Sequence, residues 1–240
     1  MSIDEVLFAF IVASGLIISI FRHKLTRAAA ITGALIAIAI YLATGWTGFL
    51  CMTAFFIMGT FSTSFQKEKK KEFAGEIKME EKRDVFQVFA NAGMAALTAL
   101  FFLFFQSDNF LFIIIIASVF SSAAADTVSS ELGMVWGKRF YNITSLRPGQ
   151  RGQDGVISLE GTLAGVFASV IIAVIYFIFQ GWSIYFLVII VSGTIGNLSD
   201  SLLGATLERK RIIGNNMVNF LNTVIAAITS ILFYILLPEK

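Results

Sequence analysis

The chain has 240 residues, of which 57% are hydrophobic and only 14% are charged. Soluble domains carry about 25% charged residues, so this composition excludes an ordinary soluble domain and indicates a protein embedded in lipid. A single cysteine excludes a disulfide framework, and a single histidine excludes a metal cluster of several histidines. Long apolar runs favour helices over a closed barrel, whose strands alternate apolar and polar residues.

Eight apolar segments follow one another along the chain, and each approaches the ~20 residues that a helix needs to cross the hydrocarbon core. Because lipid offers no hydrogen-bond partners to the backbone, these segments are expected to be helical. The sequence therefore predicts an all-α, polytopic transmembrane bundle of about eight spans, forming a single integral membrane domain over residues 1–240. The expected spans are 5–21, 28–44, 46–61, 85–105, 109–127, 160–179, 182–203 and 216–237.

Basic residues mark one side of the predicted bundle. Cytoplasmic loops carry an excess of Lys and Arg, and every basic residue except Lys240 falls in connections that the eight segments place on a common side. We therefore expect an inner-membrane protein with both termini outside. Besides a short basic turn after the first segment, its cytoplasmic loops are expected at about 62–84, 134–159 and 208–215. The connections on the other side are short, so a functional site is expected within the bundle or at its cytoplasmic face.

The first large loop is dominated by charge, with seven basic and six acidic residues between positions 66 and 84. One interpretation is a solvated amphipathic helix with ion pairs between residues four apart. A second, compatible interpretation is that Lys67 and Lys69–Lys71 contact anionic lipid headgroups. Neither interpretation implies catalysis.

The second large loop contains three glycines, two arginines and Asp154 between Arg147 and Gly155. Glycine lets backbone N–H groups approach an anion, and arginine matches phosphate oxygens in pairs. These residues favour a phosphate-binding loop, and the alternative is a flexible turn that carries the charges of membrane topology. The pattern is neither a Walker A loop nor a dinucleotide fingerprint.

Polar residues recur at helical spacing near the cytoplasmic ends of the last four segments. The fifth segment carries Asp126 with neighbouring serines, and the seventh carries Asp200 with Asn197 and Glu208. The residues at the start of the sixth and eighth segments are Ser158, Glu160, Asn215, Asn219 and Asn222. Serine and asparagine also hold membrane helices together, which is the alternative interpretation of each residue taken alone.

Carboxylates near the membrane interior usually face a cavity or a partner. Mg²⁺ takes one or two carboxylates together with waters and substrate phosphates, so Asp126 and Asp200 are the expected Mg²⁺ ligands. The expected catalytic set is Asp126, Glu131, Glu160 and Asp200. The expected substrate- and nucleotide-binding residues are Ser129, Ser130, Lys138, Arg147, Arg151, Asp154, Ser158, Asn197, Ser201, Glu208, Lys210, Asn215, Asn216 and Asn219.

Four motifs in this order resemble those of the integral membrane family called domain of unknown function 92, which includes transmembrane protein 19 and the plant phytyl-phosphate kinase. They are DTVSSELG at 126–133, SLEGTLAG at 158–165, GNLSDSLLGA at 196–205 and NNMVN at 215–219. The resemblance implies a polytopic helical fold. For the plant member it implies phosphorylation of a prenyl monophosphate by a nucleoside triphosphate. The loop PGQRGQDG at 148–155 differs from the family's usual, more compact Arg/Pro-Gly-Thr-Asn/Glu-Gly.

The leading hypothesis is a Mg²⁺-dependent kinase of an isoprenoid lipid phosphate, with CTP or ATP as the donor. Arg147, Arg151, Lys138 and Lys210 would neutralise charge on the transferred group, and Glu131 or Glu160 would orient the acceptor. A transporter or flippase is the first alternative, and a cytidylyl transferase acting on a lipid phosphate is the second. The apolar outer halves of the later segments favour a one-sided enzyme over a transporter. The expected partners are the lipid phosphate, the nucleotide and membrane lipids, and not nucleic acid.

Overall fold

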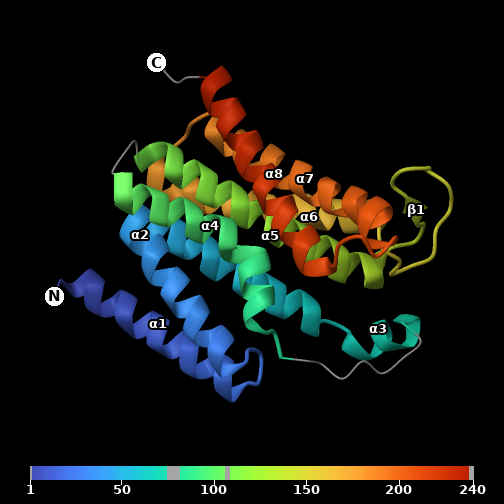
Figure 1. Ribbon diagram of the computed structural model, residues 1–240, viewed down its shortest axis with the longest axis horizontal. Coiled ribbons are helices and arrows are strands. Elements are labelled where there is room, and N and C mark those ends of the chain that lie inside the picture. Colours follow the sequence, from blue (N-terminus) through green and yellow to red (C-terminus); the bar gives the residue numbers. More distant parts are fainter. Residues whose placement is uncertain (1, 75–81, 106–108, 238–240) are drawn as a thin grey trace.

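The computed structural model describes residues 2–74, 82–105 and 109–237. Positions 75–81 of the first large loop and Lys240 therefore lie outside the described residues. Within them the chain forms helices and one two-stranded hairpin (Figure 1). The helices are α1 (Ile3–Phe21), α2 (Arg27–Ser64), α3 (Lys67–Ala74), α4 (Val85–Phe105), α5 (Asn109–Trp136), α6 (Leu159–Gln180), α7 (Tyr185–Leu203) and α8 (Asn215–Leu236). The antiparallel strands are β1 (Tyr141–Asn142) and β2 (Val156–Ile157), and a π-helical turn, η1 (Gly204–Glu208), follows α7.

Seven of the described helices are long and apolar enough to cross a membrane, and α2 contains two of the predicted segments. At Gly45 the backbone leaves the helical region with φ 61° and ψ −147°. Ala37 and Phe49, on opposite sides of this break, pack with Phe8 in one cluster. The chain therefore folds back at Gly45, and the two halves of α2 correspond to the expected spans 28–44 and 46–61 (Figure 1). The predicted all-α membrane bundle is confirmed.

Helix α5 is the centre of the bundle. It packs against α2, α4, α6, α7 and α8, and 89% of its most apolar stretch is buried, compared with 39% or less in every other candidate span. Its first half is rich in isoleucine and its second half in alanine and serine. Small side chains let neighbouring helices approach closely. The polar residues of α5 are therefore enclosed by several helices.

Glycines bring α6 directly against α5. A Cβ added to Gly161 would lie 2.7 Å from the carbonyl oxygen of Ser129 and 3.0 Å from the Cα of Gly133. A Cβ added to Gly165 would lie 2.8 Å from the carbonyl oxygen of Ala125. No larger residue fits these positions without moving a backbone. This contact fixes the face of α5 that carries Asp126 relative to the neighbouring helices.

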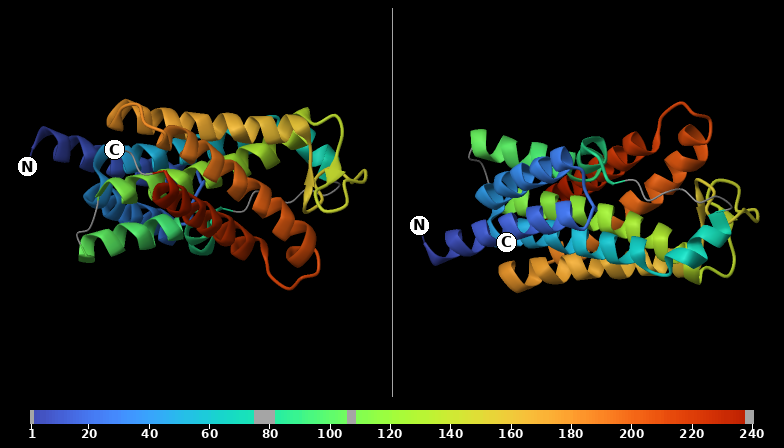
Figure 2. Two further views of the ribbon diagram at one scale, coloured as in Figure 1. Left: turned by 90° about the horizontal axis from the view of Figure 1, so that it is seen from above. Right: turned by 90° about the horizontal axis from the view of Figure 1, so that it is seen from below.

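The basic connections gather at one end of the bundle, which we call the basic end (Figure 2). The turn between α1 and α2 is joined to the residues before α4 by two backbone hydrogen bonds. Thr26 N donates to Arg83 O at 3.1 Å, and Arg83 N donates to Lys24 O at 3.1 Å. Helix α3, the β1–β2 hairpin and the connection from α7 to α8 lie at the far tip of this end, whereas the α1–α2 turn and the start of α4 are set back toward the middle of the bundle (Figures 1 and 2). The shared location agrees with the expected loops. That this end faces the cytoplasm stays a prediction.

Candidate functional site

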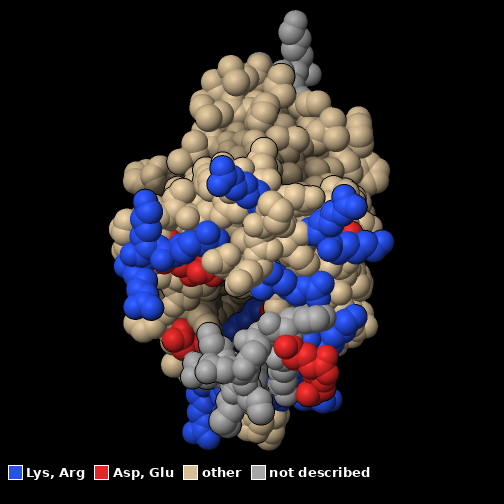
Figure 3. Space-filling model, turned by 90° about the vertical axis from the view of Figure 1, so that its right-hand side faces the viewer, with Lys and Arg blue, Asp and Glu red and all other residues tan. Residues whose placement is uncertain are grey.

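A cavity of about 930 Å³ opens at the basic end, and its mouth is visible as a hollow between charged side chains (Figure 3). The ends of α2, α5 and α7, the starts of α6 and α8, helix α3 and the segment around the β1–β2 hairpin surround it. Among the predicted site residues, those that line the cavity are Ser129, Ser130, Glu131, Arg151, Asp154, Ser158, Asn197, Asp200, Ser201, Glu208 and Asn215. Separate helices therefore contribute to one cavity.

Asp126 and Asp200 face each other from α5 and α7. Their carboxyl groups lie within electrostatic interaction distance of one another, and the Ser130 side chain lies beside Asp126. Only 8% of the surface of Asp126 is exposed. The structure thus brings together the two residues that the sequence predicts as Mg²⁺ ligands.

Helix α8 supports this pair through Asn222, a member of the predicted polar stripe that was not among the expected site residues. Its side-chain Nδ2 donates to Asp200 Oδ1 at 2.8 Å. Its Oδ1 accepts a hydrogen bond from Ser122 Oγ on α5 at 3.1 Å. One asparagine therefore joins the three helices that surround the carboxyl pair.

A second polar contact joins α5 and α7 beside the cavity. Ser129 Oγ lies 2.9 Å from Asn197 Oδ1 and 3.0 Å from the backbone oxygen of Asp126. Asn197 is only 4% exposed. Ser129 and Asn197 therefore have the helix-joining role that was the alternative interpretation of the polar stripes.

The glycine-rich loop packs on the π-helical turn. Gly155 has φ 70°, and a side chain there would collide with the backbone of Ala205. Arg209 Nη2 donates a hydrogen bond to the carbonyl oxygen of Asp154. Together these contacts place Asp154 and Glu208 on the same wall of the cavity as Asp200. The loop is thus docked on the bundle, unlike the flexible turn that was its alternative interpretation.

Arg151 lines the cavity, but its guanidinium contacts the end of α5. Its Nη2 donates to Gly137 O at 2.8 Å and its Nη1 to Met134 O at 3.3 Å. The guanidinium also lies 4.8 Å from the centre of the Phe140 ring. A cation here satisfies the last carbonyls of a helix and interacts favourably with its dipole. Arg151 therefore has a structural role that the sequence did not indicate.

Seven of the predicted site residues are not among those that line the cavity, namely Asp126, which is buried on α5 beside Asp200, and Lys138, Arg147, Glu160, Lys210, Asn216 and Asn219. Arg147 lies on the exposed side of the β1–β2 connection, where its backbone oxygen accepts from Asn142 N at 2.9 Å. Glu160, in the first turn of α6, accepts a hydrogen bond from the backbone N–H of Lys138 at 3.3 Å. Lys138 and Arg147 are exposed with the β1–β2 hairpin, whose fold has no signature in their spacing, and Lys210 is exposed in the connection from α7 to α8.

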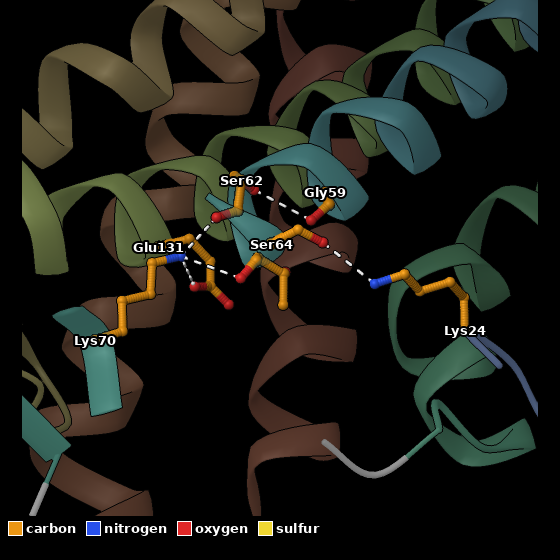
Figure 4. Close-up of polar contacts among 7 residues, drawn as sticks. Lys24, Gly59, Ser62, Ser64, Lys70 and Glu131 are labelled. Atoms are coloured by element: carbon orange, nitrogen blue, oxygen red, sulfur yellow. Dashed lines mark hydrogen bonds and ion pairs between the residues drawn. The ribbon is translucent and has the colours of Figure 1, made fainter. Parts of the chain in front are cut away.

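Helix α3 contributes cations that the sequence analysis assigned to lipid headgroups. Lys67 and Lys70 both line the cavity. Lys70 Nζ lies 2.6 Å from Glu131 Oε2 and donates to Ser62 O at 2.5 Å, at the end of α2 (Figure 4). Lys70 is thus directed inward. The spacing of three residues between Lys67 and Lys70 could have indicated a shared helix face. The lysines on either side of Lys70 made this pair hard to distinguish in the sequence.

Glu131 is approached by a second cation, Arg83, which precedes α4. Burial lowers the pKa of the Arg83 guanidinium, and the nearby Glu131 carboxylate partly offsets this by raising it. Arginine keeps its charge at neutral pH. Glu131 therefore lies between two basic residues. This arrangement suits a carboxylate that holds the two cations in place better than one that acts as a general acid or base.

The donor set fits Mg²⁺ bound to a polyphosphate. Within residues 2–74, 82–105 and 109–237, no group of three or more His, Cys, Asp or Glu side chains is arranged to hold a metal by itself. A closed protein-only site of the zinc type is therefore not supported there. Mg²⁺ needs only one or two carboxylates when phosphate oxygens and waters complete its shell, and Asp126 and Asp200 supply that number.

Comparison with known proteins gives relatives across most of the chain. An uncharacterized membrane protein of Methanocaldococcus jannaschii is 35% identical over 191 residues, covering 79% of this chain and 77% of the relative. An uncharacterized membrane protein of Synechocystis sp. is 34% identical over 203 residues, covering 82% of this chain and 77% of the relative. Protein VTE6, chloroplastic, of Arabidopsis thaliana is 32% identical over 196 residues, covering 78% of this chain and 59% of the relative.

No solved structure matches the chain. The family described as integral membrane protein DUF92 matches residues 10–227, which include every helix that lines the cavity. The protein therefore belongs to the DUF92 family of integral membrane proteins.

Proposed function

We propose that this protein is a membrane-embedded prenyl-phosphate kinase, which transfers a phosphoryl group from CTP or ATP to phytyl phosphate or a polyprenyl phosphate. The observation that carries the proposal is the Asp126–Asp200 pair beside a cavity at the basic end of a membrane bundle. The resemblance of its motifs to a family that includes a plant phytyl-phosphate kinase, together with its similarity to the plant protein VTE6, chloroplastic, supports this substrate class. The cavity volume of about 930 Å³ is in the range of small-molecule sites.

The proposed chemistry follows from the residues present. An oxygen of the prenyl phosphate attacks the terminal phosphorus of the donor, the bond to the bridging oxygen breaks, and a nucleoside diphosphate leaves. When bound, Mg²⁺ supplies neutralising charge to the phosphates. Asp126 and Asp200 would hold the ion, and Asn222 keeps Asp200 oriented toward its partner. The acceptor is already ionised, so no strong base is needed.

The position of the cavity suits a substrate with one apolar and one charged end. An isoprenoid tail is soluble only in the bilayer, whereas a nucleotide arrives from water. A site at the end of the bundle lies at the boundary between the two phases. Because the basic end carries the Lys and Arg excess that marks the cytoplasmic side, the proposed active face is cytoplasmic.

The test is a transfer assay with purified protein in detergent, Mg²⁺, geranylgeranyl phosphate and either ATP or CTP labelled in the γ-phosphate. Labelled geranylgeranyl diphosphate is expected with at least one donor, and chelation of Mg²⁺ should abolish it. Folded, monodisperse protein that yields no labelled diphosphate with either donor would overturn the proposal.

Parallel measurements separate the alternatives. CTP labelled in the α-phosphate distinguishes a cytidylyl transferase, because only that reaction leaves the label on the lipid. Uptake of a lipid phosphate or a small solute into proteoliposomes, in the absence of nucleotide, would identify a transporter.

A further inference from the structure

We infer that helix α3 forms the phosphate-binding wall of the cavity, with Lys67 and Lys70 binding the polyphosphate of the donor and Glu131 positioning Lys70. The donor's identity rests on the proposed function, but binding of a polyphosphate does not. The ligand class is a Mg²⁺-bound polyphosphate that enters from water.

The first observation is where the lysines lie. Lys67 and Lys70 line the cavity from one face of α3, since residues three apart on a helix are neighbours. Lys69, between them in sequence, is exposed. Within the described ranges, these two are the lysines that line the cavity. The predicted cations Lys138, Arg147 and Lys210 are not among its lining residues.

The second observation is how Lys70 is held. Its ammonium contacts Ser62 O at 2.5 Å, Glu131 Oε2 at 2.6 Å and Thr63 O at 3.4 Å (Figure 4). The last contact is long, so a phosphate oxygen can replace it at little cost. The hydroxyl of Thr63 has no hydrogen-bond partner among the described residues, and Thr63 also lines the cavity. Lys70 is therefore fixed in place beside the Thr63 hydroxyl, which is able to donate a hydrogen bond to a ligand.

The third observation is the charge around Glu131. Lys70 and Arg83 both interact with this single carboxylate, so the group of three retains one positive charge. Asp154, Asp200 and Glu208 lie on the other wall of the cavity. A Mg²⁺-bound polyphosphate presents its cation to carboxylates and its remaining anionic oxygens to lysines. The two walls together match that distribution of charge.

The position of α3 favours the soluble donor over the lipid phosphate. The helix lies at the basic end near the β1–β2 hairpin, beyond the membrane-spanning parts of α2 and α4 (Figure 1). The Asp126–Asp200 pair lies on helices inside the bundle. A polyphosphate that reaches from α3 toward this pair would have the phosphates that lie farther from the pair beside the lysines.

The experiment measures binding of Mg²⁺-tripolyphosphate to the purified full-length chain in detergent by isothermal titration calorimetry. We expect Lys67→Ala and Lys70→Ala each to raise Kd by about tenfold or more, because each removes a charge-assisted contact. Lys69→Ala is the matched control, with the same helix and the same charge change, and should alter Kd by less than about twofold. Lys70→Arg keeps the charge and should retain part of the binding, which guards against loss of folding in Lys70→Ala.

Glu131 is tested by a double-mutant cycle on the same Kd. If Glu131 acts by positioning Lys70, Glu131→Gln weakens binding in the wild-type background and has much less effect when Lys70 is already alanine. If Glu131→Gln changes Kd equally with Lys70 present and with Lys70 replaced by alanine, the positioning role is contradicted. Such an equal change is what a general loss of stability would produce, because that loss does not depend on Lys70.

Three outcomes would overturn the inference. Lys67→Ala and Lys70→Ala could bind tripolyphosphate as wild type does, or Lys69→Ala could weaken binding equally. Alternatively, the two lysine variants could lose binding of geranylgeranyl phosphate while keeping that of tripolyphosphate. Failure of the proposed function is separate: α3-dependent binding without phosphoryl transfer would support the inference and contradict the kinase.

Discussion

At the scale of single residues, the central feature is a pair of carboxyl groups held together inside a membrane bundle. Two negative charges so close together repel strongly where water is scarce. The pair is therefore stable when it holds a shared proton or a bound cation. Asn222 fixes Asp200 by a hydrogen bond from α8, and Ser130 of α5 lies beside Asp126. A site built this way is ready for a divalent ion carried by phosphate.

We predict that Asp126→Asn and Asp200→Asn each lower phosphoryl transfer by about 100-fold or more, because each removes a charge that the metal–phosphate complex needs. Asparagine has nearly the same shape, so the unfolding temperature should not fall. The measurement is single-turnover transfer of labelled phosphate. Asp4→Asn is the control, because Asp4 is exposed near the N-terminus and lies far along the chain from both residues. Variants with near wild-type transfer would exclude the pair from the reaction.

Asn222 is predicted to matter for stability as well as for geometry. Asn222→Ala removes the partner of Asp200 Oδ1 and the shorter of the two hydrogen bonds that the Ser122 hydroxyl makes to Asn222, at a cost of about 1–3 kcal/mol. Asn216→Ala is the matched control, because Asn216 lies in the same helix and is exposed. Thermal unfolding in detergent measures both. Equal unfolding temperatures for the two variants would show that the bridge contributes nothing.

At the scale of elements, the arrangement depends on where helices break and where they touch. Helix α5 continues to Trp136, well past the expected end of its segment at residue 127. Its polar last turns are helical because they face a cavity and other helices, and hydropathy alone does not distinguish this from a loop. The β1–β2 hairpin and the π-helical turn were likewise not indicated, because they arise from contacts between Gly155 and the end of α7.

Gly45 is predicted to be essential for the reversal within α2. Its φ and ψ of 61° and −147° belong to a region that is open almost only to glycine, so Gly45→Ala should destabilise the protein by about 1–3 kcal/mol. Gly33→Ala, in the same helix with open space around the added methyl, should have little effect or a slightly favourable one. Differential thermal unfolding distinguishes the two. A tolerated Gly45→Ala would mean that the chain does not fold back at this residue.

At the scale of the whole molecule, the sequence predicted the membrane bundle and the gathering of basic loops, because hydropathy and the distribution of Lys and Arg act over whole segments. It also predicted that Asp126 and Asp200 approach each other. It did not predict which cations reach the cavity. Arg151 is held by the carbonyls of α5, whereas Lys70 is drawn inward by Glu131. Those choices depend on how a connection folds, which spacing along the chain does not encode.

Membrane topology gives a prediction for the whole chain. Cys51 is completely buried, so the native protein should not react with an impermeant maleimide. In right-side-out vesicles we expect Trp182→Cys, at the end opposite the cavity, to be labelled, and Ser145→Cys, beside the β hairpin, to be labelled only after detergent is added. Both positions are exposed. Labelling of Ser145→Cys in intact vesicles would place the basic end outside the cell.

The most direct test of the account is anomalous diffraction from crystals grown with Mn²⁺ and a non-hydrolysable nucleoside triphosphate, since Mn²⁺ accepts the same oxygen ligands as Mg²⁺. The account predicts an anomalous peak between the carboxylates of Asp126 and Asp200, in contact with the phosphates of the nucleotide. A bound nucleotide whose metal lies away from both carboxylates would contradict it.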